Sequence, residues 1–146
     1  MITKVLVAID GSESSNRALD FGLDLAEKYN ASVTVLNVVN APVYAPSPDP
    51  LTISPDVALL SKDLRKVHES ILAKALERAA SFKPNVSVRT ELRDGNPSDQ
   101  IVLTASEGGF EVIVVGQGGE SKARKFLLGS TSQRVVNAAE CAVLIV

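Results

Sequence analysis

The sequence contains few of the residues from which catalytic and metal-binding sites are most often built. Its 146 residues include one cysteine, one histidine and no tryptophan. A single cysteine excludes an internal disulfide and the usual multi-cysteine zinc sites. We interpret Cys141, inside the apolar run 141–146, as a small buried hydrophobic residue. Because no second histidine is available for a metal-binding or catalytic pair, His68 is interpreted as a solvated helix residue.

The sequence also lacks a strong charge of either sign. Lysine and arginine number 15 against 17 aspartate and glutamate residues, a formal net charge of −2. This charge provides no general attraction to nucleic acid or to an anionic membrane. No apolar run approaches the length of a membrane span, and no basic segment with an apolar stretch and cleavage site opens the chain. We therefore expect a cytoplasmic protein that binds neither nucleic acid nor membranes.

Short apolar segments alternate along the chain with segments of helical periodicity, and the length suits one domain over residues 1–146. Segments typical of strands are 5–9, 32–39, 86–92, 112–116 and 141–146. Helical spacing of apolar residues or helix start and stop signals appear between them, at about 14–30, 60–82, 97–109 and 130–139. Strict alternation of this kind predicts an α/β fold, an open five-stranded parallel sheet with helices on both faces.

One long segment, 40–55, fits neither pattern. It contains five prolines, so neither a helix nor a central strand persists there. A segment of this length inside a small domain is typical of a flap over a site, a partner-contacting loop or a mobile excursion. The sequence leaves these three possibilities open.

Glycines gather directly after the predicted strand 112–116. Gly116, Gly118 and Gly119 fall within four positions, and Gly129 precedes the hydroxyl-rich start of the last predicted helix, 130–132. Glycine lets backbone N–H groups approach a phosphate closely, and a helix N-terminus attracts anions. Lys122, Arg124 and Lys125 lie on the intervening segment and could add positive charge. The same residues are also explained by an ordinary strand-to-loop turn and by Ser130 as an N-cap.

Asp10 ends the first predicted strand. In parallel sheets, ligands bind beyond the carboxyl ends of the strands, so Asp10 and Gly116 are expected at one crevice if their strands are neighbours. The Asp10 carboxylate could hydrogen-bond ribose hydroxyls or help to hold a metal ion. It could equally cap the following helix together with Ser12.

At these residues the sequence resembles the universal stress protein family. Nucleotide-binding members of that family carry Gly-x2-Gly-x9-Gly-Ser/Thr after the fourth strand, and Gly116, Gly119, Gly129 and Ser130 reproduce this spacing without insertion. Further similarities, at 5–10, 36–39, 94–97 and 139–146, extend the resemblance over the whole chain. The resemblance implies a Rossmann-like fold of the adenine nucleotide alpha hydrolase type, with strand order 3-2-1-4-5.

The resemblance also implies a nucleotide site. The ligand would be ATP, or ADP or AMP, with Mg²⁺ or Mn²⁺ bridging phosphate oxygens and Asp10 as the one candidate protein ligand for the metal. The backbone of Val38 would meet the adenine edge, and Asp10 and Gly116 would flank the ribose. The nucleotide-binding residues implied are Ala8, Ile9, Asp10, Val38, Val115, Gly116, Gly119, Gly129, Ser130, Thr131 and Ser132.

Assembly and activity follow as further expectations from the resemblance. The final strand of the family often pairs with its own copy, so a homodimer through 141–146 would cover an apolar edge strand. We therefore expect an ATP-binding regulatory protein that acts as a stress-response or signalling dimer with an unidentified protein partner. A slow metal-dependent ATP hydrolase is one alternative, although no general base lies near the glycine motif. A dimeric interaction module without nucleotide is the other.

Overall fold

The computed structural model describes residues 1–40, 55–118 and 128–146. The predicted proline-rich segment therefore falls almost wholly outside the described residues. The elements in chain order are β1 (Lys4–Ala8), α1 (Glu13–Tyr29), β2 (Ser32–Val39), α2 (Pro55–Phe82), β3 (Val88–Asp94), α3 (Pro97–Gly108), β4 (Val112–Val115), α4 (Ser130–Ala138) and β5 (Ala142–Ile145). No helix in the described ranges is both long enough and apolar enough to span a membrane.

The five strands form one parallel sheet in the order β3-β2-β1-β4-β5. Both the predicted α/β class and the predicted strand order are confirmed. The chain first builds outward from β1 to β2 and β3, and then crosses to the other side of β1 to form β4 and β5. The order therefore reverses between β1 and β4, which is the position where sheets of this type leave a crevice.

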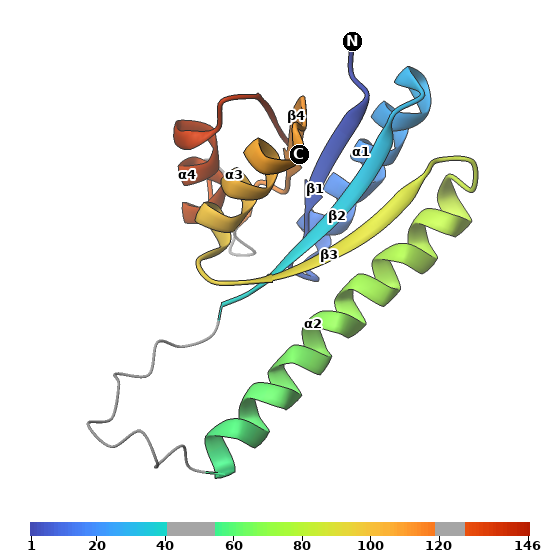
Figure 1. The fold of residues 1–146 in the computed structure, drawn as a ribbon. Coiled ribbons are helices and arrows are strands. Elements are labelled where there is room, and N and C mark those ends of the chain that lie inside the picture. The colour runs from blue at the N-terminus through green and yellow to red at the C-terminus, as the bar shows by residue number, and fades with distance from the viewer. Residues whose placement is uncertain (41–54, 119–127) are drawn as a thin grey trace.

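Helices cover both faces of the sheet (Figure 1). On one face α1 and α2 pack against side chains such as Val5, Val7 and Val35. On the other face α3 and α4 pack against Leu6 and Ile113, among others. Strand side chains point alternately to the two faces, so the middle of the sheet is apolar on both sides: β4 is apolar throughout, and β1 is apolar after Lys4. Each buried valine or leucine contributes roughly 1.5–3 kcal/mol relative to leaving it exposed.

Helix α2 is longer than the sheet it covers. Its 28 residues span about 42 Å, whereas the 8 residues of β2 span about 26 Å. Figure 1 shows the N-terminal turns projecting beyond the strands. The predicted apolar stripe is consequently buried only in part: Leu72, Ala75 and Ala79 lie in the core, but Leu60 and Val67 are 60% and 56% exposed.

Strand β3 begins two residues later than predicted. Val86 belongs to the turn after α2, where its N–H donates to the carbonyl of Lys83 at 3.1 Å. Pairing with β2 begins with the N–H of Val33 donating to Ser87 and continues until Gly95 donates to Val39. The alternation of apolar and polar residues correctly predicted a strand here, but its predicted ends were each two residues too early because the turn after α2 includes Val86.

Candidate functional site

A pocket of about 300 Å³ opens at the carboxyl ends of the strands, at the point where the strand order reverses. Ten of the predicted site residues line it: Ala8, Ile9, Asp10, Val38, Val115, Gly116, Gly129, Ser130, Thr131 and Ser132. The eleventh, Gly119, lies outside the described residues. The structure thus brings together residues that are more than 120 positions apart in the sequence. Their role in binding remains a prediction.

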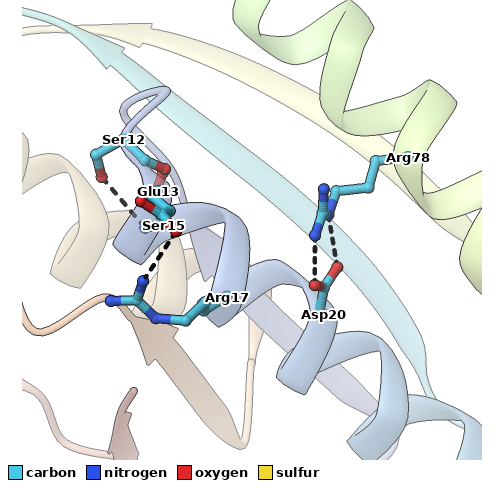
Figure 2. Close-up of polar contacts among 6 residues, drawn as sticks. All are labelled: Ser12, Glu13, Ser15, Arg17, Asp20 and Arg78. Atoms are coloured by element: carbon cyan, nitrogen blue, oxygen red, sulfur yellow. Dashed lines mark hydrogen bonds and ion pairs between the residues drawn. The ribbon is translucent and has the colours of Figure 1, made fainter.

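The turn from β1 into α1 forms one wall of the pocket. The Ser12 hydroxyl caps α1 by accepting from the Ser15 N–H at 3.2 Å, and Figure 2 shows this contact at the first turn. Asp10 supports the turn, because its Oδ1 accepts from the Ser12 N–H at 2.9 Å. The helix is therefore capped by Ser12 and not by Asp10. The Asp10 carboxylate remains at the exposed edge of the pocket.

Asp10 is held as a carboxylate. Burial alone would raise its pKa, but hydrogen bonds from the side chain and backbone of Ser12 and from Ser15 outweigh this effect and lower the pKa below its ordinary value. Asp10 is therefore ionised at neutral pH. A fixed negative charge here accepts hydrogen bonds from neutral hydroxyls and repels phosphate groups, so it distinguishes the two ends of the pocket.

The glycines have a packing role that the sequence had left open. A Cβ on Gly116 would lie 2.4 Å from Ser14 Oγ, so only glycine lets the first turn of α1 approach the end of β4. Gly118 has φ +74°, and a Cβ on it would lie 3.2 Å from the Cα of Gly129. The N–H of Gly129 also donates to the carbonyl of Gln117 at 2.9 Å. The segments 116–118 and 128–132 are therefore in direct contact beside the pocket.

The start of α4 is an uncapped helix end. Gly129, and not Ser130, occupies the N-cap position, so the N-cap interpretation of Ser130 is wrong. The Ser132 hydroxyl donates to the carbonyl of Gly116 at 2.8 Å, whereas the hydroxyls of Ser130 and Thr131 bond to no described residue. The first amides of a helix lack intrahelical partners and carry the positive end of its dipole. This end of the pocket is suited to an anion, although the described lining includes no lysine or arginine.

An apolar wall also lines the pocket. It consists of Leu36 and Val38 from β2 together with Pro97 and Ile101 from α3. Neither Pro97 nor Ile101 is among the site residues predicted from the sequence. A signal was available, because α3 starts directly after β3, at the same end of the sheet as Asp10 and Gly116.

His68 is not a solvated helix residue. It is half-buried, and its Nδ1 contacts Oδ1 of Asn37, a buried side chain on β2. His68 does not line the pocket, but Asn37 also contacts the backbone of Ile9, which does. Cys141, predicted to be buried, is half-buried against the core below α3 and α4, and burial raises the pKa of its thiol.

A second hollow, about 900 Å³ in volume, lies between α3 and α4. It is larger than the pocket at the strand ends, but it is lined by the two helices and the segments that follow them, and it contains none of the predicted site residues. Ligand sites of open parallel sheets lie at the carboxyl ends of the strands, so the smaller pocket is the better candidate.

The described residues suit a metal ion that is coordinated mainly by a bound molecule and only to a small extent by the protein. No three His, Cys, Asp or Glu side chains among them are grouped so that they could hold a metal ion by themselves. Asp10 is the one acidic side chain on the described pocket lining. It could contribute a single oxygen ligand beside phosphate oxygens, as Mg²⁺ and Mn²⁺ favour.

Comparisons with known proteins agree on one family. The family model described as the universal stress protein family matches residues 1–146. The universal stress protein YxiE of Bacillus subtilis (strain 168) is 36% identical over 149 residues, covering 100% of this chain and 99% of the relative. The structure of universal stress protein UspA from Lactobacillus plantarum superimposes with a TM-score of 0.81 at 23% identity, covering 99% and 97% of the two chains. A universal stress protein in complex with cAMP superimposes with a TM-score of 0.69 at 28% identity, covering 99% and 96%.

Proposed function

Because this chain belongs to the universal stress protein family, we propose that its pocket at the strand ends binds an adenine nucleotide: ATP, ADP or AMP. The protein would act as a regulator in a stress response or signalling process, with nucleotide occupancy as the signal. The observation that carries the proposal is the N-terminus of α4: it lines the same pocket as the Asp10 carboxylate and the apolar wall, and its Ser130 and Thr131 hydroxyls bond to no described residue. A related protein of 28% identity was solved with cAMP, which supports the choice of an adenine nucleotide.

The pocket offers three chemically different surfaces, which come from neighbouring strands in the order β2, β1 and β4 and from the helices beside them. The base would lie against Leu36, Val38, Pro97 and Ile101, and the ribose hydroxyls would donate to the Asp10 carboxylate. The phosphates would lie at the start of α4, where the first helix amides attract an anion. The volume of about 300 Å³ is at the lower end of the range for small-molecule sites, about 300–1,000 Å³.

A divalent cation would be held chiefly by the phosphate oxygens. When bound, Mg²⁺ or Mn²⁺ would neutralise part of the phosphate charge, and Asp10 is the acidic side chain of the described pocket lining that would ligate the cation. We propose binding, rather than fast turnover, as the main role. A carboxylate whose pKa lies below its ordinary value is a weak general base.

We also propose a homodimer through the edge of β5. This strand pairs with β4 on one side and with no described strand on the other. The N–H groups of Ala142 and Val146 donate to Glu111 and Val115, so the peptide groups of even-numbered residues face β4. Because the peptide groups along a strand point alternately to its two sides, those of Val143 and Ile145 point away from β4, where a second copy could pair with them.

The nucleotide proposal is tested by calorimetry with ATP, ADP, AMP and, as a ligand without phosphate, adenosine. A double variant, Ser130→Ala with Thr131→Val, removes the two free hydroxyls without removing any hydrogen bond within the described structure. Hydrogen bonds to charged groups contribute about 1.5–3 kcal/mol, so ATP affinity should fall by about tenfold or more while adenosine affinity stays constant.

Ser81→Ala, at an exposed position near the end of α2, is the matched control and should change neither affinity. Mass spectrometry of the denatured wild-type protein should also detect a co-purified adenine nucleotide. If the wild-type protein binds none of the four ligands, the proposal is wrong. Equal loss of ATP and adenosine affinity in the double variant would show that the phosphates do not lie at α4.

A further inference from the structure

The hydrogen bonds between β1 and β2 follow a regular alternation. The N–H of Ser32 donates to Thr3, and the N–H of Ile9 donates to Leu36, each at 2.9 Å. The peptide groups of the even-numbered β2 residues therefore face β1, while those of Val33 and Val39 face β3. In a parallel ladder the next bond in this series would run from the N–H of Val38 to the carbonyl of Ile9.

That bond is replaced by a side chain. The carbonyl of Ile9 accepts instead from Nδ2 of Asn37 at 2.8 Å, and the register between β1 and β2 ends at Ala8 and Leu36. Within the described residues, neither the N–H nor the carbonyl of Val38 has a hydrogen-bond partner on the β1 side. Val38 and Ile9 both line the pocket, so this donor and acceptor face the gap where the two strands separate.

Asn37 is held in the orientation that this replacement needs. Its side chain is only 1% exposed, and because Nδ2 donates to Ile9, the other amide atom, Oδ1, must be an acceptor. His68 contacts Oδ1 through Nδ1, so Nδ1 carries the proton. A buried amide is unfavourable unless its polar atoms have hydrogen-bond partners, and His68 on α2 is the partner of Oδ1.

We propose that Asn37, held by His68, is a positioning residue that keeps the Val38 peptide groups free to bind the edge of the adenine base. The inference rests on the proposed nucleotide function and deepens it by assigning base recognition to this device. An N–H donor and a carbonyl acceptor on one residue match the N1 acceptor and N6 amino donor of adenine. Guanine presents its acceptor and donor in the opposite order, so the pair also favours adenine over guanine.

The test compares Asn37→Leu with the wild-type protein. Leucine has a similar volume but cannot donate to Ile9, so the Val38 N–H should close the ladder onto the Ile9 carbonyl. The affinities for adenosine and ATP should then both fall, by about tenfold or more, because both ligands carry the base. His68→Leu should weaken binding in the same way. His68→Asn, which keeps a donor near the position of Nδ1, should restore most of it.

Amide hydrogen exchange of Val38 separates positioning from a merely structural role. In the free wild-type protein this amide should exchange rapidly, and saturating adenosine should protect it. In Asn37→Leu it should be protected without ligand. The wild-type measurement decides the matter even if Asn37→Leu does not fold.

Two results would overturn the inference while leaving the proposed function intact. One is a wild-type protein that binds adenosine although its Val38 amide is already protected in the free state. The other is a folded Asn37→Leu variant that binds adenosine as tightly as the wild type. A wild-type protein that binds neither adenosine nor ATP would instead refute the proposed function itself.

Discussion

Gly116 shows how one residue can be required by packing and by a ligand site at once. A Cβ at this position would lie 2.4 Å from Ser14 Oγ and 2.8 Å from the Ser14 carbonyl carbon. The second contact is with backbone, so a rotamer change of Ser14 cannot relieve it. The absence of a side chain at Gly116 thus sets how closely the first turn of α1, with the Asp10–Ser12 turn before it, approaches β4.

Gly116→Ala should therefore destabilise the fold by about 1–3 kcal/mol, the usual cost of overpacking. Urea denaturation measures this change in the free energy of unfolding. Gly109→Ala is the matched control, because its φ is +62° but nothing lies within 4 Å of an added Cβ. Its cost should be about 1–2 kcal/mol, from the backbone conformation alone. A Gly116→Ala protein as stable as the wild type would contradict the packing role.

The sequence predicts the location of some residues of the site and not of others. Asp10 and Gly116 could be assigned to one pocket because each follows an apolar strand, and parallel strands end at the same edge of a sheet. The contact of His68 with Asn37 could not be predicted. It joins residues 31 positions apart, and it depends on the rotation of α2 against the sheet, which no local pattern determines. The alternative of Ser130 as an N-cap was open because serine favours that position, but glycine is also a favourable N-cap residue, and Gly129 occupies it.

At the scale of elements, α1 and α2 are joined by charged pairs along their exposed sides. Figure 2 shows the guanidinium of Arg78 facing the carboxylate of Asp20. Two parallel hydrogen bonds form, at 2.7 Å from Nε and 2.6 Å from Nη2, and they raise the pKa of Arg78. Further along, Lys83 lies within 2.9 Å of Asp24 and 2.6 Å of Glu27. These pairs connect α1 with α2 and the residue after it at the exposed margin of their apolar contact.

A double-mutant cycle with Asp20→Asn and Arg78→Gln should give a coupling free energy of less than about 1 kcal/mol, because both side chains are partly exposed to water. The coupling should decrease further in 1 M salt, where screening is strong. Chemical denaturation of the four proteins at two salt concentrations measures it. A coupling that salt leaves unchanged would mean that the two hydrogen bonds, rather than the charges, join the helices.

Elements were easier to predict than their ends or their exposure. Apolar runs identified β1, β4 and β5, of which β1 and β4 lie in the buried middle of the sheet, whereas β-branched residues identified β2. The ends of β3 were displaced because Val86 has the apolar character of a strand residue but belongs to a turn. Periodicity also assigned Leu60 and Val67 to a buried stripe. Hydrophobic periodicity indicates which side of a helix is apolar, but it does not indicate where the sheet under the helix ends.

At the scale of the whole molecule, β5 leaves one edge of the sheet open. Val143 and Ile145 turn their peptide groups toward that edge, while their side chains pack on the core below α3 and α4. Substituting a charged residue at either position would therefore disturb folding as well as assembly. A proline at position 143 removes an outward N–H and no bond to β4, as edge strands allow.

Val143→Pro should convert the proposed dimer to a monomer while the fold is retained. Sedimentation velocity or light scattering measures the mass, and circular dichroism checks the fold. Leu144→Pro is the contrasting variant, because the Leu144 N–H faces β4 and its loss should destabilise the sheet itself. If the wild-type protein is a dimer and Val143→Pro remains one, the copies do not pair through β5.

Helix α2 also has a mechanical property that follows from its length. It touches the turn beside the pocket at Gly11, where an added Cβ would lie 3.1 Å from Ile71 Cδ1. The turns of α2 before Ile71 form an arm of about 24 Å, much of it beyond the sheet. A tilt of about 5° around this contact displaces the far end of the arm by about 2 Å. A small tilt of α2 beside the pocket would therefore move the surface that carries Leu59 and Leu60 by a larger distance.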